Sequence, residues 1–254
     1  MSGHSKWSQI KRSKAKIDAQ KGALFSKISK EIVVAVRMGG GPDVGSNFRL
    51  RTVIEKAKVA SMPVDNIKRA IQRASGDSST DNYEEIQYEG YGPCGTAIIV
   101  STMTDNRNRT AGDIRSYFTK CDGNLGETGC VSWMFVTKGL ITVTSLNGKA
   151  IDFDELFLSA ADSGAEDVIE LDEGAYQVQT KPENLEKVEK ALKEMGYATQ
   201  DVEVSQEPEN TVQIEDFDKA KKVIKLIDLL ESHDDVQDVY SNFELSDEVL
   251  SLVS

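Results

Sequence analysis

The most constraining feature of this sequence is the alternation of strand-like and helix-like patterns between residues 140 and 204. Strand patterns at residues 140–144, 167–171, 176–180 and 200–204 are interleaved with helical patterns at residues 153–161 and 185–195. The two middle strands flank a short turn, Asp172-Glu-Gly174. The order βαββαβ is that of the ferredoxin-like split βαβ arrangement. We therefore predict a ferredoxin-like α+β domain over residues 138–205.

The N-terminal part of the chain shows a helical pattern, with apolar residues three and four positions apart. The first such helix is predicted over residues 24–37, and Met38-Gly-Gly-Gly-Pro42 ends it. A second helix is centred on residues 50–57. A third has Pro63 in its first turn and Gly76 after its end. These three helices, with the segment before them, predict an arm and helical bundle over residues 1–77.

The segments between and after these two regions predict one more domain. A polar linker at 76–82 precedes a strand at 96–103, a helix at 110–121 opened by the capping box Thr110-Ala-Gly-Asp113, and a strand at 131–136. A second polar linker at 205–210 precedes a helix at 217–230 and a strand at 236–240. This last αβ pair is too small to be stable alone. We predict that it completes a discontinuous α+β domain of residues 83–136 plus 207–246, in a three-domain α+β chain.

The charges are segregated along the chain. Residues 1–75 carry 16 lysines and arginines against five acids, a net charge of +11, and the remainder carries −23, giving the total of −12. Such asymmetry predicts a polyanion-binding end and an acidic body. Because fields are largely screened beyond about 8 Å at physiological salt, the basic end can act locally. The alternative is a charged surface that only keeps the protein soluble. Solubility needs net charge, however, and does not need the charges to be segregated.

Residues 5–22 are the strongest candidate for a functional site. Cations fall on all sides of a helix built from this segment, so it cannot bury a broad face in its own domain. Trp7 fits two roles, stacking on a base or anchoring the arm to the bundle. The predicted nucleic-acid-binding residues are His4, Ser5, Lys6, Trp7, Lys11, Arg12, Lys14, Lys16 and Lys21.

Two further segments are candidates for anion contacts. The glycines at 39–41 follow a helix and no Gly-Lys-Ser/Thr closes them, so they are not a P-loop; we predict a hinge whose backbone N–H groups could touch phosphate. Arg107 and Arg109 stand at a predicted helix N-terminus, where the helix dipole is also positive, so both need an anion nearby. Asp105 could supply that anion internally for one of them. Otherwise both arginines are possible sites for an external anion.

The sequence argues against enzymes, metal sites and membrane spans. Cys94, Cys121 and Cys130 form no C-x-x-C pair, which indicates reduced thiols in the cytoplasm, and with only two histidines a Cys/His metal site is not expected. No G-x-S-x-G or H-E-x-x-H motif is present. No apolar run approaches the ~20 residues that span a bilayer, and no secretory signal is seen. We expect a non-enzymatic protein without cofactor, metal, small-molecule substrate or membrane association, and no particular oligomeric state is indicated.

Several stretches of the sequence resemble the YebC family of gene-expression regulators. They are the opening Gly3-His-Ser-Lys-Trp7, Gly39-Gly-Gly41, Tyr88-Glu-Gly-Tyr-Gly-Pro93, Asp105-Asn-Arg-Asn-Arg-Thr110, Gly123-Asn-Leu-Gly126 and Trp133-Met-Phe135. The resemblance is collinear over essentially the whole chain. Cys94 replaces a frequent glycine and Ser2 a frequent alanine, and neither change touches a proposed contact.

The resemblance implies an N-terminal helical bundle, two α+β domains, and neither catalytic residue nor cofactor. It implies a function described in two ways: DNA-binding transcriptional regulation, or ribosome-associated translation control that relieves stalling, notably at proline-rich stretches. An arm charged on all sides suits phosphate and shape contacts on RNA better than base readout in duplex DNA. We therefore favour ribosomal RNA as the partner over DNA. A third hypothesis is a protein-interaction adaptor that uses the acidic domains.

Overall fold

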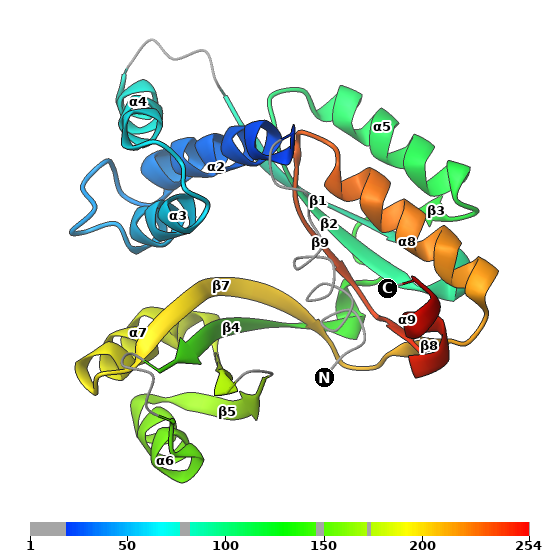
Figure 1. The fold of residues 1–254 in the computed structure, drawn as a ribbon. Coiled ribbons are helices and arrows are strands. Elements are labelled where there is room, and N and C mark those ends of the chain that lie inside the picture. The colour runs from blue at the N-terminus through cyan, green and yellow to red at the C-terminus, as the bar shows by residue number, and fades with distance from the viewer. Residues whose placement is uncertain (1–18, 77–81, 146–149, 172–173, 254) are drawn as a thin grey trace. The chain divides into compact units, whose positions relative to one another are not determined.

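The computed structural model describes residues 19–76, 82–145, 150–171 and 174–253 (Figure 1). It divides into two compact units, residues 1–135 with 208–254 and residues 136–207. The described elements form a helical bundle, an α+β domain and a ferredoxin-like domain, which confirms the predicted fold class. The exact domain boundaries stay predictions. No helix within the described ranges is long and apolar enough to cross a membrane.

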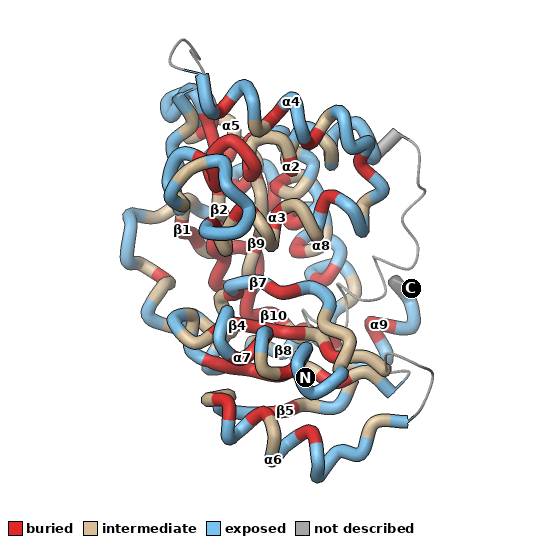
Figure 2. Tube along the Cα trace, turned by 90° about the vertical axis from the view of Figure 1, so that its left-hand side faces the viewer, coloured by how far each residue is buried: buried red, intermediate tan, exposed pale blue. Residues whose placement is uncertain are grey.

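The bundle consists of α2 (Ala19–Met38), α3 (Phe48–Val59) and α4 (Val64–Ser75). Its core is formed by the apolar faces that the spacing predicted, including the fully buried Ile28, Ile32 and Leu50. In Figure 2 buried and exposed stretches alternate along these helices, as expected for amphipathic helices on one core. The described part of α2 already includes residues 19–23, ahead of the predicted helix. Pro63 is the N-cap of α4 and therefore lies just before its first turn, not within it.

The second domain contains a four-stranded sheet in the order β3-β1-β2-β9. Its elements are β1 (Glu84–Tyr91), η1 (Pro93–Gly95), β2 (Ala97–Thr104), α5 (Arg107–Lys120), β3 (Asn124–Leu125), η2 (Ser132–Met134), α8 (Phe217–Glu231) and β9 (Val236–Ser241). Strand β2 is antiparallel to both β1 and β9, so β9 completes the sheet from the far end of the chain. Helices α5 and α8 cover the same face of the sheet (Figure 1), and their apolar side chains share one core with β2 and β9.

Both faces of β2 are buried. Ile98 and Val100 belong to the core under α5 and α8, whereas Ala97 and Ile99 face the opposite way and pack with Val131 and Phe135. This alternation follows from the period of two in a strand. A short parallel pair, β8 (Val212–Ile214) and β10 (Phe243–Leu245), and helix α9 (Asp247–Val253) complete the domain.

Several sequence-based assignments in this domain were wrong or incomplete. The strand predicted at 131–136 is largely a 3₁₀ turn, η2, and the true strand starts at Phe135. Backbone N–H groups of this segment bond to the buried carboxylate of Glu89 and are therefore not available to a sheet. Strand β1 was not predicted at all, because its glutamates and glycine obscure the apolar alternation and only part of it is buried.

The ferredoxin-like unit contains β4 (Phe135–Thr144), α6 (Phe153–Ser163), β5 (Ala165–Glu170), β6 (Tyr176–Thr180), η4 (Pro182–Asn184), α7 (Leu185–Glu194) and β7 (Ala198–Pro208). The strand order is β5-β6-β4-β7, with β6 antiparallel to both β5 and β4. This confirms the predicted βαββαβ arrangement. Strand β7 continues through Pro208, so the linker predicted at 205–210 was wrong over most of its length. Ser205 is buried there despite its linker-like surroundings.

Candidate nucleic-acid interface

Most of the predicted nucleic-acid-binding residues lie outside the described part of the chain. This group comprises His4, Ser5, Lys6, Trp7, Lys11, Arg12, Lys14 and Lys16, all within residues 1–18. Lys21 is described, and it lies exposed in the first turns of α2. The predicted contacts of the arm therefore stay predictions, and the structure bears on the basic bundle that follows it.

The outer face of α4 is basic. Ile67, Ala70 and Ala74 are buried, and the exposed positions between them are Lys68, Arg69, Gln72 and Arg73. Because buried and basic positions alternate at the helical period, the cations share the side of the helix away from the core. The Arg69 guanidinium donates to Asn66 Oδ1 at 2.7 Å and, through Nε, to the Asp65 carbonyl. This side of α4 can therefore meet a phosphate backbone with several cations.

Two of the bundle's acids are engaged within the bundle. Glu31 is buried and accepts a hydrogen bond from Lys56 Nζ at 2.7 Å. Burial raises the pKa of Glu31, and the neighbouring Lys56 partly offsets that rise. Asp43 accepts from the Gly45 N–H and the Ser46 hydroxyl, which lowers the pKa of Asp43. Among the described residues, the exposed Lys58 and Lys68 have no such carboxylate partner.

In the glycine turn after α2, two of the three backbone N–H groups are engaged within the chain. The N–H groups of Gly39 and Gly41 donate to the carbonyls of Ala35 and Val36 and so satisfy the end of the helix. The buried Asn47 then donates to the carbonyls of Ala35 and Gly41, both at 2.8 Å, while its Oδ1 caps α3. A Cβ at position 39 would lie 2.5 Å from the Ala35 oxygen. This turn is therefore built to close one helix and start the next, and the phosphate contact considered from the sequence is not available at these two N–H groups.

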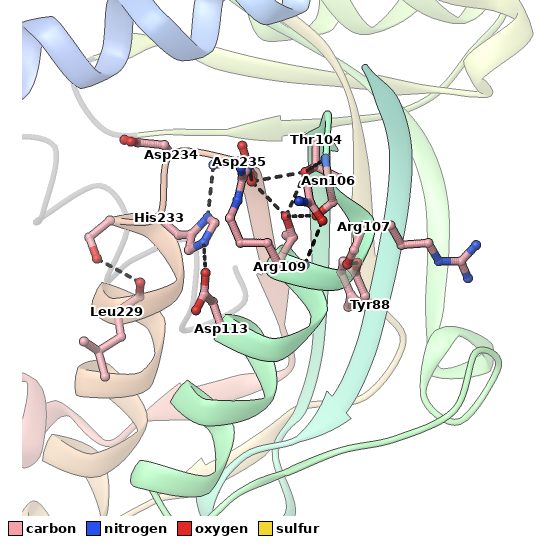
Figure 3. Close-up of polar contacts among 12 residues, drawn as sticks. Tyr88, Thr104, Asn106, Arg107, Arg109, Asp113, Leu229, His233, Asp234 and Asp235 are labelled. Atoms are coloured by element: carbon pink, nitrogen blue, oxygen red, sulfur yellow. Dashed lines mark hydrogen bonds and ion pairs between the residues drawn. The ribbon is translucent and has the colours of Figure 1, made fainter. Parts of the chain in front are cut away.

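The bundle is tied to the second domain by a buried carboxylate, that of Asp235, between α8 and β9. Lys30 of α2 donates to Asp235 Oδ1 at 2.6 Å. Arg109 of α5 donates to Asp235 Oδ2 at 2.9 Å (Figure 3). The hydroxyls of Thr110 and Thr104 also donate to Oδ2, at 2.8 and 3.2 Å. Burial alone would raise the pKa of Asp235, but the hydrogen bonds from Lys30, Arg109 and Thr110 outweigh it and hold this pKa well below its ordinary value.

Arg109, one of the two arginines proposed to bind an external anion, has its anions inside the chain. It bonds to Asp235 and, at 2.9 Å, to Asp105, the internal partner considered from the sequence. Arg107 is exposed and extends away from the Asp235 cluster in Figure 3, while its carbonyl accepts a bond from the Tyr88 hydroxyl. No side-chain partner for Arg107 occurs in the described ranges. The external-anion hypothesis therefore rests on Arg107 alone.

The start of α5 differs from the predicted capping box. The helix begins at Arg107, and the Asn106 side chain accepts the bond from the Arg109 N–H at 3.1 Å. Thr110, predicted as the cap, lies within the first turns and contacts Asp235 instead. Sequence patterns missed Asp235 and Lys30 because a carboxylate after a helix and a lysine on a helix are both usually solvated. Only the fold brings them together.

A cavity of about 510 Å³ opens beside this cluster. Its walls include Lys30, Tyr83, Asp113, Tyr117 and His233. The Nδ1 atom of His233 accepts from the Asp235 N–H at 3.0 Å, so Nε2 carries the proton and donates to Asp113 at 3.2 Å. Because both ring nitrogens are engaged, this imidazole cannot act as a general base without losing one of these bonds. In the described ranges no group of three potential metal ligands is assembled.

Three of the stretches that carried the family resemblance, 88–93, 123–126 and 133–135, lie close together at the end of β1. The Glu89 carboxylate accepts from the backbone N–H groups of Gly129, Val131 and Ser132, at 2.8–2.9 Å. Burial would raise the pKa of Glu89, but these backbone hydrogen bonds lower it below the ordinary value. The loop presents Trp133 to solvent, 69% exposed, with its Nε1 held by the Cys130 carbonyl at 3.1 Å.

Comparison with known proteins gives the family of the chain. Residues 5–77 match the family described as "TACO1/YebC protein N-terminal domain", and residues 83–243 match "TACO1/YebC second and third domain". The chain belongs to the TACO1/YebC family. This confirms the resemblance seen in the sequence.

Relatives and a solved structure extend this similarity over the full length. Proteins named "probable transcriptional regulatory protein" from Desulfitobacterium hafniense and Persephonella marina are 51% and 50% identical. The first alignment covers 98% of each protein and the second covers 100% of each. The crystal structure of a conserved hypothetical protein from Aquifex aeolicus is 47% identical, has a TM-score of 0.82, and is matched over 93% of this chain and 96% of that one.

Proposed function

We propose that this TACO1/YebC protein is a non-enzymatic regulator of gene expression in the cytoplasm that binds nucleic acid through its basic arm and bundle. The observation that supports the proposal is the charge arrangement. The net +11 of residues 1–75 continues on the folded bundle as the exposed basic face of α4, while acids of the bundle such as Glu31 are turned inward or engaged locally. A phosphate backbone is the anion that such an extended basic surface fits best.

The favoured partner is ribosomal RNA within the ribosome, and the role is translation control that relieves stalling. Cations on all sides of the predicted arm and on the outer face of α4 suit phosphate and shape contacts, which carry almost no base sequence information. The protein should therefore bind short duplex DNA with little dependence on its sequence.

The alternative is a DNA-binding transcriptional regulator, and the names of the relatives support it. On α4, Asn66, Arg69 and Gln72 are also residue types that read base edges in the major groove. However, Asn66 Oδ1 already accepts a hydrogen bond from Arg69 in this structure. These two groups are therefore engaged with each other within the helix and not with a base.

The deciding experiment compares ribosome association with operator binding in one strain. Under the translation hypothesis the protein sediments with ribosomal particles and is released as salt rises. Variants Lys6→Ala and Trp7→Ala impair translation through slow sequences without changing transcript abundance. Lys181→Ala, an exposed lysine of the ferredoxin-like domain, serves as the matched control. A footprint on one promoter that persists against excess random DNA, with no protein in ribosomal fractions, would instead establish the transcriptional role.

A further inference from the structure

The outer face of α6, in the ferredoxin-like unit, carries apolar side chains that its own domain does not cover. Leu158 is 65% exposed, and Phe153 and Phe157 are 41% and 40% exposed. The two rings lie next to each other with centroids 6.0 Å apart, and Phe153 also contacts the buried Tyr176 at 5.8 Å. In Figure 2 much of the tube of α6 is drawn as exposed. Single exposed apolar residues are normal, but three within two turns of one helix form a patch.

The helical period places these residues on one continuous surface. Leu156 and Ala160 are fully buried and define the inner side of α6. At about 100° per residue, Leu158 lies on the side opposite to them, and Phe157 lies between Leu158 and the inner side. The patch therefore runs from the edge of the domain core, at the Phe153 and Phe157 rings, to the outermost line of the helix.

Acidic side chains border this patch. Residues 151–170 contain seven acids and no base. Asp154 and Asp162 lie on the outer side of α6 beside Leu158, and Glu166, Asp167 and Glu170 are exposed on the adjoining β5, an edge strand of its sheet. None of these carboxylates forms an ion pair within the described ranges. The surface is thus apolar at its centre and negative at its border. Lys187 of α7 reaches Gly164 at the end of α6, but the acids of the border outnumber it.

We propose that the outer face of α6 binds a basic protein, one that presents apolar side chains flanked by lysine or arginine. The negative charge at the border attracts a positively charged partner and repels negatively charged ones. Leu158 and the two phenylalanines supply the apolar area that the partner buries. Nucleic acid and anionic membrane are repelled by the same carboxylates. A symmetric pairing of two α6 faces is opposed as well, because it sets acids against acids. Basic protein components of nucleic-acid machines have the required charge.

The test uses the full chain and defined peptides as probes. A labelled helical peptide with leucine at every third and fourth position and arginine elsewhere is titrated by fluorescence anisotropy at physiological salt. It should bind the wild-type chain, and the double variant Phe157→Ser/Leu158→Ser should weaken binding about tenfold or more, because the apolar centre is lost. The exposed Val59→Ser of α3 is the matched control, and it should bind as wild type does. The double variant Asp154→Asn/Asp162→Asn should weaken peptide binding several-fold. It should not make the salt dependence of that binding steeper.

Three outcomes would overturn the proposal. The first is equal affinity of the wild type and the Phe157→Ser/Leu158→Ser variant, since charge alone would then explain the binding. The second is equal binding of a leucine–glutamate peptide, because the acidic border would then select nothing. The third is a concentration-dependent oligomer of the chain that this double variant abolishes, which would make the face a self-interface. The inference is independent of nucleic-acid binding, because the double variant should keep the polyanion affinity of the wild type.

Discussion

The helical bundle and the ferredoxin-like domain are similar in size but opposite in what they present to solvent. In the bundle, Glu31 is buried against Lys56, and exposed cations such as Lys58 and Lys68 line the surface. In the ferredoxin-like unit, residues 136–207 contain 16 acids and six lysines, and α6 also exposes apolar side chains. Because each region has an excess of one sign of charge, each disfavours a partner of that same sign. In our proposals the two regions therefore bind different classes of partner.

The comparison also shows that not every basic residue of the bundle is free to bind a polyanion. Lys30 belongs to the same helix as the exposed Lys21, yet its ammonium group lies on the buried Asp235 of the second domain. The net charge of a segment overstates the charge that a ligand can meet. Predictions about binding should therefore concern exposed cations, and predictions about stability should concern the buried carboxylates.

The largest effect is expected from neutralising the arm. Replacing Lys11, Arg12, Lys14 and Lys16 together by alanine should flatten the dependence of log affinity on log salt by about three units for single-stranded RNA. Each phosphate contact contributes roughly 0.7 to the slope for single strands, because binding releases condensed counterions. Fluorescence titrations at several salt concentrations measure this slope.

The matched control removes lysines from the acidic region. The exposed Lys181, Lys187 and Lys190 of the ferredoxin-like domain are replaced by alanine in the full chain. The slope should stay that of the wild type, because these lysines lie among excess acids. If both sets of substitutions change the slope equally, the contrast between the two regions does not govern binding.

The second prediction concerns the carboxylate that joins the bundle to the second domain. Asp235→Asn should lower the free energy of unfolding by about 2–4 kcal/mol, because Lys30 and Arg109 lose their shared charge and a buried partner is left poorly satisfied. Urea denaturation checks this. Asp234→Asn, at the exposed neighbouring position, should change stability by less than about 0.5 kcal/mol. Similar losses in both variants would mean that Asp235 is no more important than a surface acid.

The apolar elements of the fold and its polar contacts differ in how far the sequence could predict them. Apolar spacing was sufficient for α2, α7 and α8, since long periodic helices bury one face whatever their neighbours are, and a continuous apolar run was sufficient for β2. The cap of α5 is local, since Asn106 accepts from the Arg109 N–H, but the capping pattern at Thr110 predicted a later start. The turn at 131–134 depends on Glu89, which lies 42 positions before Val131 in the chain. Asp235 resembled a solvated acid for the same reason. Polar networks that join distant segments leave no local pattern, whereas charge segregation does.

The third prediction is a pH-dependent loss of stability at Glu89. Glu89→Gln should destabilise the protein by about 1–3 kcal/mol at neutral pH, because hydrogen bonds to a charged acceptor become bonds to a neutral one. The pKa of Glu89 is lowered from 4.5 in the folded state, so its contribution is full above that value and is lost as pH falls through the folded pKa. The difference between wild type and variant in urea denaturation should therefore shrink below about pH 4.5.

Glu127→Gln provides the control for this prediction. Glu127 is exposed in the same loop, and its backbone carbonyl, not its side chain, accepts the bond from Cys130. The substitution should therefore leave stability nearly unchanged at every pH. A difference between wild type and Glu89→Gln that does not vary with pH would show that the hydrogen bonds to Glu89 do not require its charge.

The smallest effects are expected at the two arginines at the start of α5. Although they lie within one turn of the helix, one should affect stability and the other binding. Arg109→Ala should lower the free energy of unfolding by about 1 kcal/mol, since its pair with Asp235 is only partly shielded from solvent, and should leave polyanion affinity unchanged. Arg107→Ala should keep stability within about 0.5 kcal/mol of wild type. If Arg107 meets a phosphate, this variant should flatten the salt slope for RNA by about 0.7, one contact's worth. Urea denaturation and salt titration of both variants give a two-by-two comparison. The reverse assignment, with Arg109 controlling the slope, would mean that nucleic acid displaces Asp235 from its arginine and that the junction opens on binding.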